Sequence, residues 1–285
     1  MKTLVLGASG FIGTAFLKQD LKDNIEIVTR NNSLNVTKYK THIGDIKDKD
    51  FLKNLAEHEF EKVINFSWEG LPNISEKNNK INLEVQLNVI KTFADSGTKQ
   101  FDIAGSCLEY GSFEGKASEV QIGSDLTDFA KTKLRLLDFL QTQSLMHRWF
   151  RMFYVYGPKQ HNKSLLASAY LSAKQGAMLQ VSNSNISRDF IYVDDVASAI
   201  NKLTSNLSAQ GVFNIGSGEP TGITQMVSKV YTHFGLDFDV LKISKNRSLI
   251  ADTRRIKEVC DWNPVYTIDS GINQYINWAN QVNFS

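Results

Sequence analysis

The sequence contains few of the residues that build disulfide frameworks or metal centres. Two cysteines, Cys107 and Cys260, occur in 285 residues, and the five histidines show no metal-ligand spacing. We therefore expect neither a disulfide scaffold nor a bound metal, and the composition fits a reducing cytoplasm.

The chain also lacks a strong charge of one sign and any long apolar run. Its formal net charge is +2 at pH 7, which gives no support to a nucleic-acid partner. No apolar run is long enough to span a membrane, and Leu4–Leu6 is too short for a signal peptide. We therefore expect a cytoplasmic globular protein with one large or two smaller domains and no membrane partner.

The first thirty residues read as a strand, a glycine turn, a helix and a second strand. Lys2–Leu6 is a short apolar run, the turn Gly7–Gly13 follows it, and Thr14–Lys22 and Ile25–Val28 are the next helical and apolar segments. Glycines in such a unit permit a tight turn and the close approach of backbone to a pyrophosphate. The pattern predicts a dinucleotide site, the alternative being a purely structural turn. The predicted cofactor contacts are Gly7, Ser9, Gly10, Phe11, Ile12 and Gly13.

The end of the second predicted strand should select the cofactor. An acidic residue there accepts a hydrogen bond from the ribose 2′-OH of NAD, whereas an arginine accommodates the 2′-phosphate of NADP. This chain has Thr29, Arg30 and Asn31 at that place and no acid. We predict that Thr29 and Arg30 contact the cofactor and that NADP(H) is favoured over NAD(H). The alternative is an Arg30 that is solvated, or that stacks on the adenine of either cofactor.

Strand-like and helix-like segments alternate further along the chain. Lys62–Phe66, Phe101–Ala104 and Trp149–Val155 read as strands, and Ile81–Ser96 and Asp128–Gln143 read as helices. Such alternation favours a parallel sheet with helices on both faces, whose ligands lie beyond the carboxyl ends of the strands. The predicted fold is therefore α/β, a doubly wound parallel sheet (Rossmann) with a smaller mixed α/β substrate lobe.

The character of the sequence changes after Pro158. We predict an NAD(P)-binding Rossmann domain over residues 1–160, to which residues of about 189–216 return, and a mainly substrate-binding lobe over 161–285. The later part should contain helices over Ser164–Gly176, Asp194–Thr204, Thr221–Phe234 and Ile272–Trp278 and strands over Met178–Val181, Asp189–Val193 and Val212–Ile215.

Eight short motifs follow one another along nearly the whole chain. They are Gly7–Gly13, Gly44–Ile46, Asn65–Trp68, Ala104–Gly111, Phe153–Pro158, Arg188–Asp195, Asn214–Gly218 and Ala251-Asp252. In this order they resemble the motifs of the extended short-chain dehydrogenase/reductase superfamily, in its NAD-dependent epimerase/dehydratase family. The resemblance implies that Gly7–Gly13 is the glycine motif, that Gly44–Ile46 lies against adenine and that Asn65–Trp68 is a cofactor loop. It further implies that Ala104–Gly111 holds the catalytic serine, that Phe153–Pro158 lies behind the nicotinamide, and that the arginine of Arg188–Asp195 grips a nucleotide-sugar diphosphate.

The same resemblance implies the remaining site residues. Ser106 would be catalytic, since its hydroxyl can bind a substrate carbonyl, although it could also be a loop serine that caps local backbone. The forked guanidinium of Arg188 suits a diphosphate, the alternative being an ion pair with Asp189 or Asp194. Implied cofactor contacts are Asp45, Ile46, Phe66, Ser67, Trp68, Lys133 and Tyr156, and implied substrate contacts are Ser106, Tyr110, Arg188 and Arg247.

Three longer stretches indicate a subgroup. Ser67–Asn73, Gly105–Gly111 and Tyr154–His161 resemble reductases of CDP-abequose-synthase type, which act on 4-keto sugars made for surface polysaccharides. The implied activity is an NAD(P)-dependent oxidoreductase of a nucleotide-linked 4-keto-6-deoxy sugar in surface polysaccharide biosynthesis. An epimerase of the same family is the alternative. A dehydratase is disfavoured, because Cys107-Leu108 stand where its acid–base pair would be.

The resemblance also bears on assembly. The family often forms homodimers through two helices that pack as a four-helix bundle. Ile81–Ser96 and Asp128–Gln143 are the candidate helices, and we expect a homodimer.

The sequence departs from the family at the catalytic tyrosine. Family members carry Tyr-x-x-x-Lys on a helix, where the spacing puts both side chains on one face. The tyrosine exchanges a proton with the substrate oxygen, and the lysine lowers its pKa and holds the nicotinamide ribose. Here the segment Thr127–Lys133 keeps Lys133 but has Phe129 at the tyrosine position, and phenylalanine has no proton to give.

Three interpretations of Phe129 are open. The sequence could carry a deliberate Tyr-to-Phe change that traps a complex. Another group, such as Tyr110, Thr127 or an ordered water, could supply the proton. The protein could also bind NAD(P) and nucleotide sugar without efficient turnover.

Overall fold

The computed structural model describes residues 1–31, 38–71, 75–181, 185–240 and 248–284. The chain forms two compact units, each built from segments that are not contiguous in sequence. The first unit comprises Met1–Ser112, Ile122–Arg151 and Ile200–Phe213, and the second comprises Phe113–Gln121, Met152–Ala199 and Asn214–Ser285. Within the described ranges, every helix is too short or too polar to traverse a lipid bilayer.

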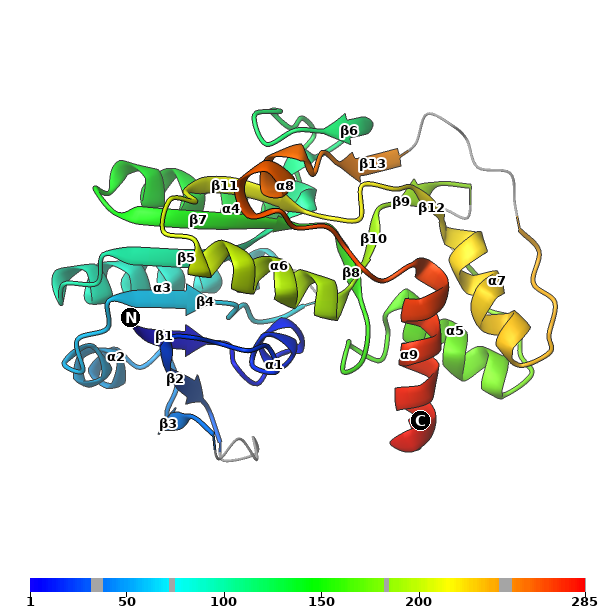
Figure 1. Cartoon of the computed structure of the whole chain (residues 1–285), viewed down its shortest axis with the longest axis horizontal. Coiled ribbons are helices and arrows are strands. Elements are labelled where there is room, and N and C mark those ends of the chain that lie inside the picture. The colour runs from blue at the N-terminus through cyan, green and yellow to red at the C-terminus, as the bar shows by residue number, and fades with distance from the viewer. Residues whose placement is uncertain (32–37, 72–74, 182–184, 241–247, 285) are drawn as a thin grey trace. The chain divides into compact units, whose positions relative to one another are not determined.

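The first unit is organised around a seven-stranded sheet in the order β11-β7-β5-β4-β1-β2-β3 (Figure 1). The strands are β1 (Lys2–Leu6), β2 (Asn24–Thr29), β3 (Lys40–Ile43), β4 (Lys62–Asn65), β5 (Gln100–Ser106), β7 (Met146–Met152) and β11 (Gly211–Ile215). Because β1 pairs in parallel with both β2 and β4, the strand order reverses beside β1, which is where ligands bind in open α/β sheets. The predicted doubly wound sheet is confirmed.

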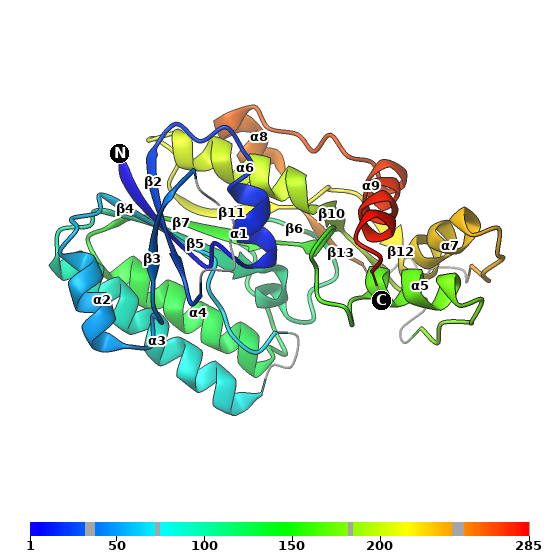
Figure 2. The ribbon, with the colours of Figure 1, turned by 90° about the horizontal axis from the view of Figure 1, so that it is seen from below.

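Helices cover both faces of this sheet, as Figure 2 shows. They are α1 (Phe11–Phe16) and the second half of α6 (Val193–Ser205) on one face, and α2 (Lys49–Ala56), α3 (Glu76–Asp95) and α4 (Asp128–Thr142) on the other. The inner strands β1 and β4 are almost entirely buried because both of their faces are covered, whereas the edge strand β3 is polar and largely exposed. Leu4–Leu6 of β1 accordingly expose no surface at all.

Three of the predicted elements differ from those in the structure. The strand expected over Trp149–Val155 is two strands, β7, which ends at Met152, and β8 (Tyr154–Tyr156), which belongs to another sheet. The helix expected over Thr14–Lys22 is α1, which begins at Phe11 and ends at Phe16. The N–H groups of Lys18 and Gln19 bond to the carbonyls of Ala15 and Phe16, in a tighter turn that closes the helix.

The strand expected over Met178–Val181 does not form. The Leu179 N–H donates to the Tyr231 hydroxyl at 2.9 Å rather than to a neighbouring strand. A side chain from α7 therefore satisfies the backbone group that a strand would have used.

The second unit contains a smaller mixed sheet, in the order β12-β9-β13-β6, and a separate parallel pair, β8 with β10. The elements are β6 (Gly115–Ala117), β8 (Tyr154–Tyr156), α5 (Leu165–Lys174), β9 (Ser187–Arg188), β10 (Phe190–Tyr192), β12 (Thr221–Gly222), α7 (Ile223–His233), β13 (Ser248–Ala251), α8 (Arg254–Cys260) and α9 (Ile268–Gln281). In the four-stranded sheet β13 runs parallel to β9, whereas β12 runs antiparallel to it. The smaller mixed α/β part of the prediction is therefore confirmed.

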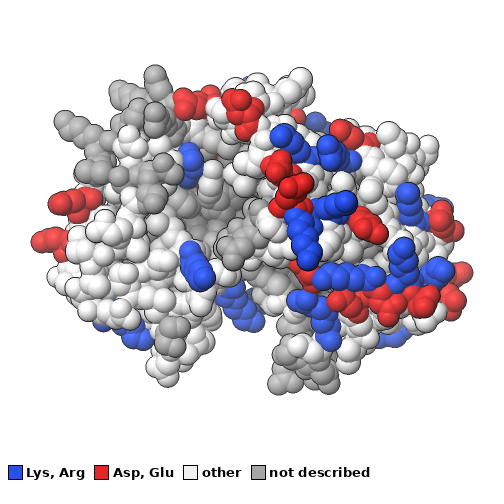
Figure 3. Space-filling view, turned by 180° about the vertical axis from the view of Figure 1, so that it is seen from behind, with Lys and Arg blue, Asp and Glu red and all other residues white. Residues whose placement is uncertain are grey.

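Charges of both signs are mixed on the side of the first unit that carries α3 and α4. Figure 3 shows this side, with Lys and Arg interspersed among Asp and Glu and no broad patch of one sign in that view. A nucleic-acid partner would need a basic stripe or patch to neutralise phosphates. This face offers none in that view.

A buried ion pair joins two central strands of the first unit. Arg148 of β7 donates to the Asp102 carboxylate of β5 at 2.9 Å, and the two side chains are 1% and 0% exposed. Gln100 also donates to Asp102, and Arg148 donates to the carbonyl of Asn206. Burial raises the pKa of Asp102, and the positive charge of Arg148 opposes that rise.

Removing one partner of this pair should destabilise the fold strongly. We expect Arg148→Met to lower the free energy of unfolding by about 3–5 kcal/mol, because it leaves a buried carboxylate without its cation. The double variant Asp102→Val/Arg148→Met should recover much of that loss. Urea denaturation followed by circular dichroism measures both, and a loss below about 1 kcal/mol for the single variant would contradict the argument.

Candidate active site

The glycine turn after β1 packs directly against the end of β4. Gly7 has a positive φ of +74°, and a Cβ added to it would lie 2.7 Å from the Phe66 carbonyl carbon. A Cβ on Gly13 would lie 2.2 Å from the Gly7 oxygen. Contacts this short exclude a side chain at either position, so the turn requires glycine there.

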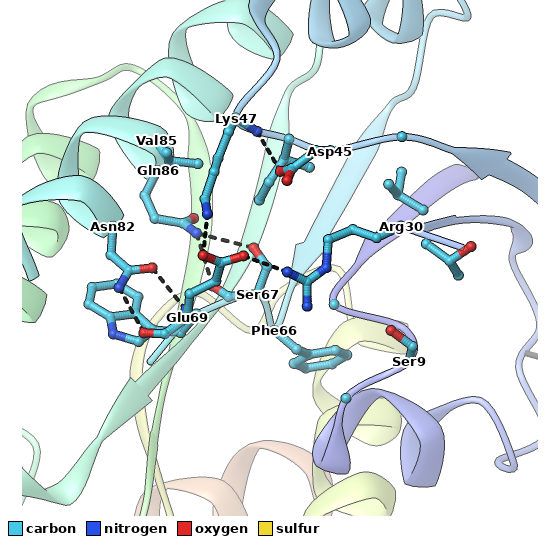
Figure 4. Close-up of a pocket in the computed structure, with 17 residues that line it drawn as sticks. Ser9, Arg30, Asp45, Lys47, Phe66, Ser67, Glu69, Asn82, Val85 and Gln86 are labelled. Atoms are coloured by element: carbon cyan, nitrogen blue, oxygen red, sulfur yellow. Dashed lines mark hydrogen bonds and ion pairs between the residues drawn. The ribbon is translucent and has the colours of Figure 1, made fainter. Parts of the chain in front are cut away.

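A pocket of about 770 Å³, counted to its open mouth, lies beyond the carboxyl ends of the first four strands. Figure 4 shows side chains from the ends of these strands and from α3 facing one another around it. Its lining residues are Gly7, Ser9, Gly10, Val28, Thr29, Arg30, Gly44, Asp45, Ile46, Lys47, Phe66, Ser67, Trp68, Glu69, Asn82, Val85 and Gln86.

Most of the predicted cofactor contacts are brought together in this pocket. Those that line it are Gly7, Ser9, Gly10, Thr29, Arg30, Asp45, Ile46, Phe66, Ser67 and Trp68. Phe11, Ile12 and Gly13 do not line it and form the start of α1. Tyr156 lies in the second unit, where its side chain is buried against Tyr192.

Sequence reasoning missed the contribution of α3 to this pocket. Asn82 exchanges two hydrogen bonds with the backbone of Glu69, both 2.9 Å long. Gln86 donates to the carbonyl of Ser67 at 2.9 Å, so the two amides hold the loop after β4. Asn82 and Gln86 are four residues apart on the buried side of α3. Two amides at helical spacing among apolar residues were the sequence signal that could have indicated this contribution.

Charged side chains meet at the mouth of the pocket. Arg30, at the end of β2, donates to the Glu69 carboxylate at 2.7 Å, and Lys47 contacts the other oxygen of the same group (Figure 4). Asp45 accepts a hydrogen bond from the backbone N–H of Lys47. The mouth therefore presents two cations and two carboxylates.

Ser106 ends β5 and is held by a buried carboxylate behind it. Glu109 accepts from the Ser106 N–H at 2.7 Å, from the indole of Trp149 at 3.0 Å and from Arg151 at 2.8 Å. Burial raises the pKa of Glu109, and the Arg151 charge and these donors oppose the rise. A Cβ on Gly105 would lie 2.2 Å from the indole nitrogen, so the strand end is tightly enclosed.

Lys133 and Phe129 lie one turn apart on α4, as the spacing predicts. The Lys133 Nζ is buried, donates to the Ala104 carbonyl at 2.8 Å and lies 3.7 Å from the centre of the Trp68 ring. Phe129 packs edge-on against Trp68, with ring centres 5.6 Å apart. Burial lowers the pKa of Lys133 to about 7, and the negative charge of Glu109 opposes this shift.

The two side chains considered as other proton donors have different surroundings. Tyr110 is fully buried, with its ring 4.7 Å from the guanidinium of Arg151. Its hydroxyl is therefore enclosed by protein. Thr127 is exposed and caps α4, where its oxygen accepts from the Ala130 N–H.

The predicted diphosphate residue lies in the second unit. Arg188 is half-buried, and its guanidinium lies 5.2 Å from the centre of the Tyr154 ring. Neighbouring Asp189 accepts from the backbone N–H groups of Ser217, Gly218 and Ala251. Within the described residues Arg188 forms no ion pair. Arg247, the other predicted phosphate contact, lies outside the described residues.

Comparison with known proteins places these features in a family. The chain is 25% identical to ADP-L-glycero-D-manno-heptose-6-epimerase of Brachyspira hyodysenteriae, over 95% of this chain and 96% of that protein. The structure resembles UDP-glucose 4-epimerase of Thermotoga maritima, solved with UDP-glucose, with a TM-score of 0.87 at 21% identity over 99% of each chain. It also resembles a UDP-glucuronic acid 4-epimerase of Bacillus cereus that carries a Tyr-to-Phe mutation, with a TM-score of 0.85 at 20% identity over 99% and 100% of the two chains.

A family model described as the NAD dependent epimerase/dehydratase family matches residues 3–216, which is more than half of the chain. The match spans the glycine turn, the pocket and the segments of Ser106 and Lys133. The chain therefore belongs to the NAD-dependent epimerase/dehydratase family, within the extended short-chain dehydrogenases/reductases.

Proposed function

We propose that the protein is an NAD(P)-dependent oxidoreductase that acts on a nucleotide-linked 4-keto-6-deoxy sugar in surface polysaccharide biosynthesis. The observation that carries this proposal is the pocket at the strand-order reversal, bounded by the glycine turn of β1. The names of similar proteins also support it, since several act on or were solved with nucleotide sugars. Four similar structures were solved with NAD.

The residues of the pocket fit a nicotinamide dinucleotide. The turn carrying Gly7 and Gly10 presents backbone without side chains, and the Ser9 and Ser67 hydroxyls add hydrogen-bonding groups. Arg30 and Lys47 are the cations that a 2′-phosphate of NADP(H) would bind, and Glu69 forms an ion pair with each of them. A bound nicotinamide supplies the hydride. The residues of the chain bind and orient the sugar and supply its proton.

At the reacting end, Ser106 and Lys133 have complementary roles in this proposal. The Ser106 hydroxyl, on a backbone held by Glu109, binds the sugar carbonyl and stabilises the charge that develops on its oxygen. Lys133 holds the nicotinamide ribose and supplies positive charge near the same oxygen. Phe129 contributes no proton, so the alcohol product takes its proton from another group.

A second candidate is an epimerase of the same family. Its support is the heptose epimerase relative, which aligns over almost the full length of both chains. A third candidate, a protein that binds NAD(P) and nucleotide sugar without efficient turnover, is supported by Phe129 packed against Trp68.

We also propose that the second unit holds the nucleotide sugar and that α3 and α4 form the interface of a homodimer. Arg188 supports the first part, because its guanidinium suits a diphosphate. The close packing of α3 and α4 in one layer supports the second.

Arg188→Ala should separate the two ligands. We expect the affinity for UDP- and CDP-sugars to fall about tenfold or more, because a charge-assisted contact to diphosphate is lost. The affinity for NADPH should change less than about twofold. Isothermal titration calorimetry with each ligand alone measures both affinities. A loss of affinity confined to NADPH would show that Arg188 is assigned to the wrong site.

Phe129→Tyr should decide between an impaired and an intact catalyst. One positioned acid contributes about 10²–10⁴-fold, so we expect NADPH oxidation with nucleotide-linked 4-keto sugars to rise by that factor. Lys133 is already placed one turn away, where its charge favours the phenolate. If another group already delivers the proton, the unmodified protein turns over well and the variant gains little. Inactivity of both proteins with tight ligand binding would exclude the reductase and favour the binding protein.

The activity of the unmodified protein should depend on the charge of Lys133. Because burial lowers the pKa of Lys133 to about 7, its ammonium is present below that pH and is lost above it. We expect kcat/KM for ketone reduction to fall as pH rises through about 7. Lys133→Arg keeps the charge and should remove this decline, whereas Lys133→Met should lower activity at every pH. A decline that persists in Lys133→Arg would assign the titration to another group.

A further inference from the structure

The mouth of the pocket holds a carboxylate that the end of β2 lacks. Glu69 comes from the loop after β4 and lies between Arg30 and Lys47 (Figure 4). We propose that Glu69 sets the choice between NAD(H) and NADP(H), by competing with the 2′-phosphate of NADP(H) for these two cations. The proposal rests on the proposed function and names the residue that decides its cofactor.

Both cations of the mouth are already engaged by one group. Arg30 binds one oxygen of Glu69 at 2.7 Å, and Lys47 binds the other. With Asp45, the four charged residues that line the pocket carry two charges of each sign. A 2′-phosphate therefore gains less attraction from Arg30 and Lys47 while the carboxylate of Glu69 stays between them, because the two anions repel each other.

The backbone of Glu69 is fixed by Asn82, whereas its carboxylate is partly exposed. Asn82 is 6% exposed and bonds to both the N–H and the carbonyl of Glu69 at 2.9 Å. Asn82 itself donates to the carbonyl of Asn78 on its own helix at 2.8 Å. The Glu69 side chain is 40% exposed, so it can turn into solvent without disturbing this anchor.

A carboxylate at this place has a use with NAD(H) as well. In dinucleotide folds an acid at the end of the second strand accepts a hydrogen bond from the ribose 2′-OH. Here Glu69 brings an acid beside Arg30 from a different strand end. With NAD(H) it can accept from the 2′-OH while keeping its cations, whereas with NADP(H) its charge opposes that of the 2′-phosphate.

Glu69→Gln tests the competition, because glutamine keeps the size of the side chain and removes its charge. We expect the ratio of Kd for NADPH to Kd for NADH to fall at least tenfold, measured by fluorescence titration at low salt. Adenosine 2′,5′-bisphosphate and AMP should show the same change, which locates the effect at the 2′-phosphate. The double variant Glu69→Gln/Arg30→Gln should not show this fall in the ratio, because Arg30, one of the two cations that Glu69→Gln leaves unpaired, is then absent.

Glu84→Gln is the matched control, because Glu84 is exposed on α3, does not line the pocket and changes the net charge equally. The ratio of Kd for NADPH to Kd for NADH in Glu84→Gln should match that of the wild type. If Glu69→Gln binds both dinucleotides with a ratio within twofold of the wild type, the proposed role of Glu69 is wrong, and the proposed function is unaffected. If the wild type binds neither dinucleotide, the proposed function fails together with this inference.

Discussion

The reacting end of the site depends on one buried carboxylate. Glu109 is 1% exposed, and burial at that level is tolerable only because Arg151, Trp149 and the Ser106 N–H all donate to it. These bonds join the end of β5 to β7 and fix the backbone that carries the Ser106 hydroxyl. The same negative charge acts on Lys133 and opposes the loss of its proton. One group therefore fixes the backbone of the serine and opposes part of the pKa shift that burial imposes on the lysine.

The parts of this structure that could be predicted from the sequence are those decided by short-range geometry. The glycine turn is determined by contacts within Gly7–Gly13 and with the strand end beside it, so its spacing identified it. The alternation of apolar strands and amphipathic helices likewise reports burial on both faces of a parallel sheet. Phe129 and Lys133 share a helix face because four residues make about one turn.

The parts that could not be predicted depend on pairs far apart in the chain. Glu69 meets Arg30 across 39 residues, and Arg151 meets Glu109 across 42. No local pattern marks such a pair, because each partner alone reads as a solvated charge. The cofactor preference is the clearest case. The end of β2 shows an arginine and no acid, yet the folded pocket supplies the acid from β4.

The side chain of Lys133 lies among aromatic rings. Phe129 and Trp68 together place aromatic rings around an ammonium whose hydrogen bond goes to the carbonyl of Ala104. An aromatic face attracts a cation, which offsets part of the cost of removing that charge from water. Burial still dominates and lowers the pKa of Lys133 to about 7, so the charge of this buried side chain is sensitive to small changes around it.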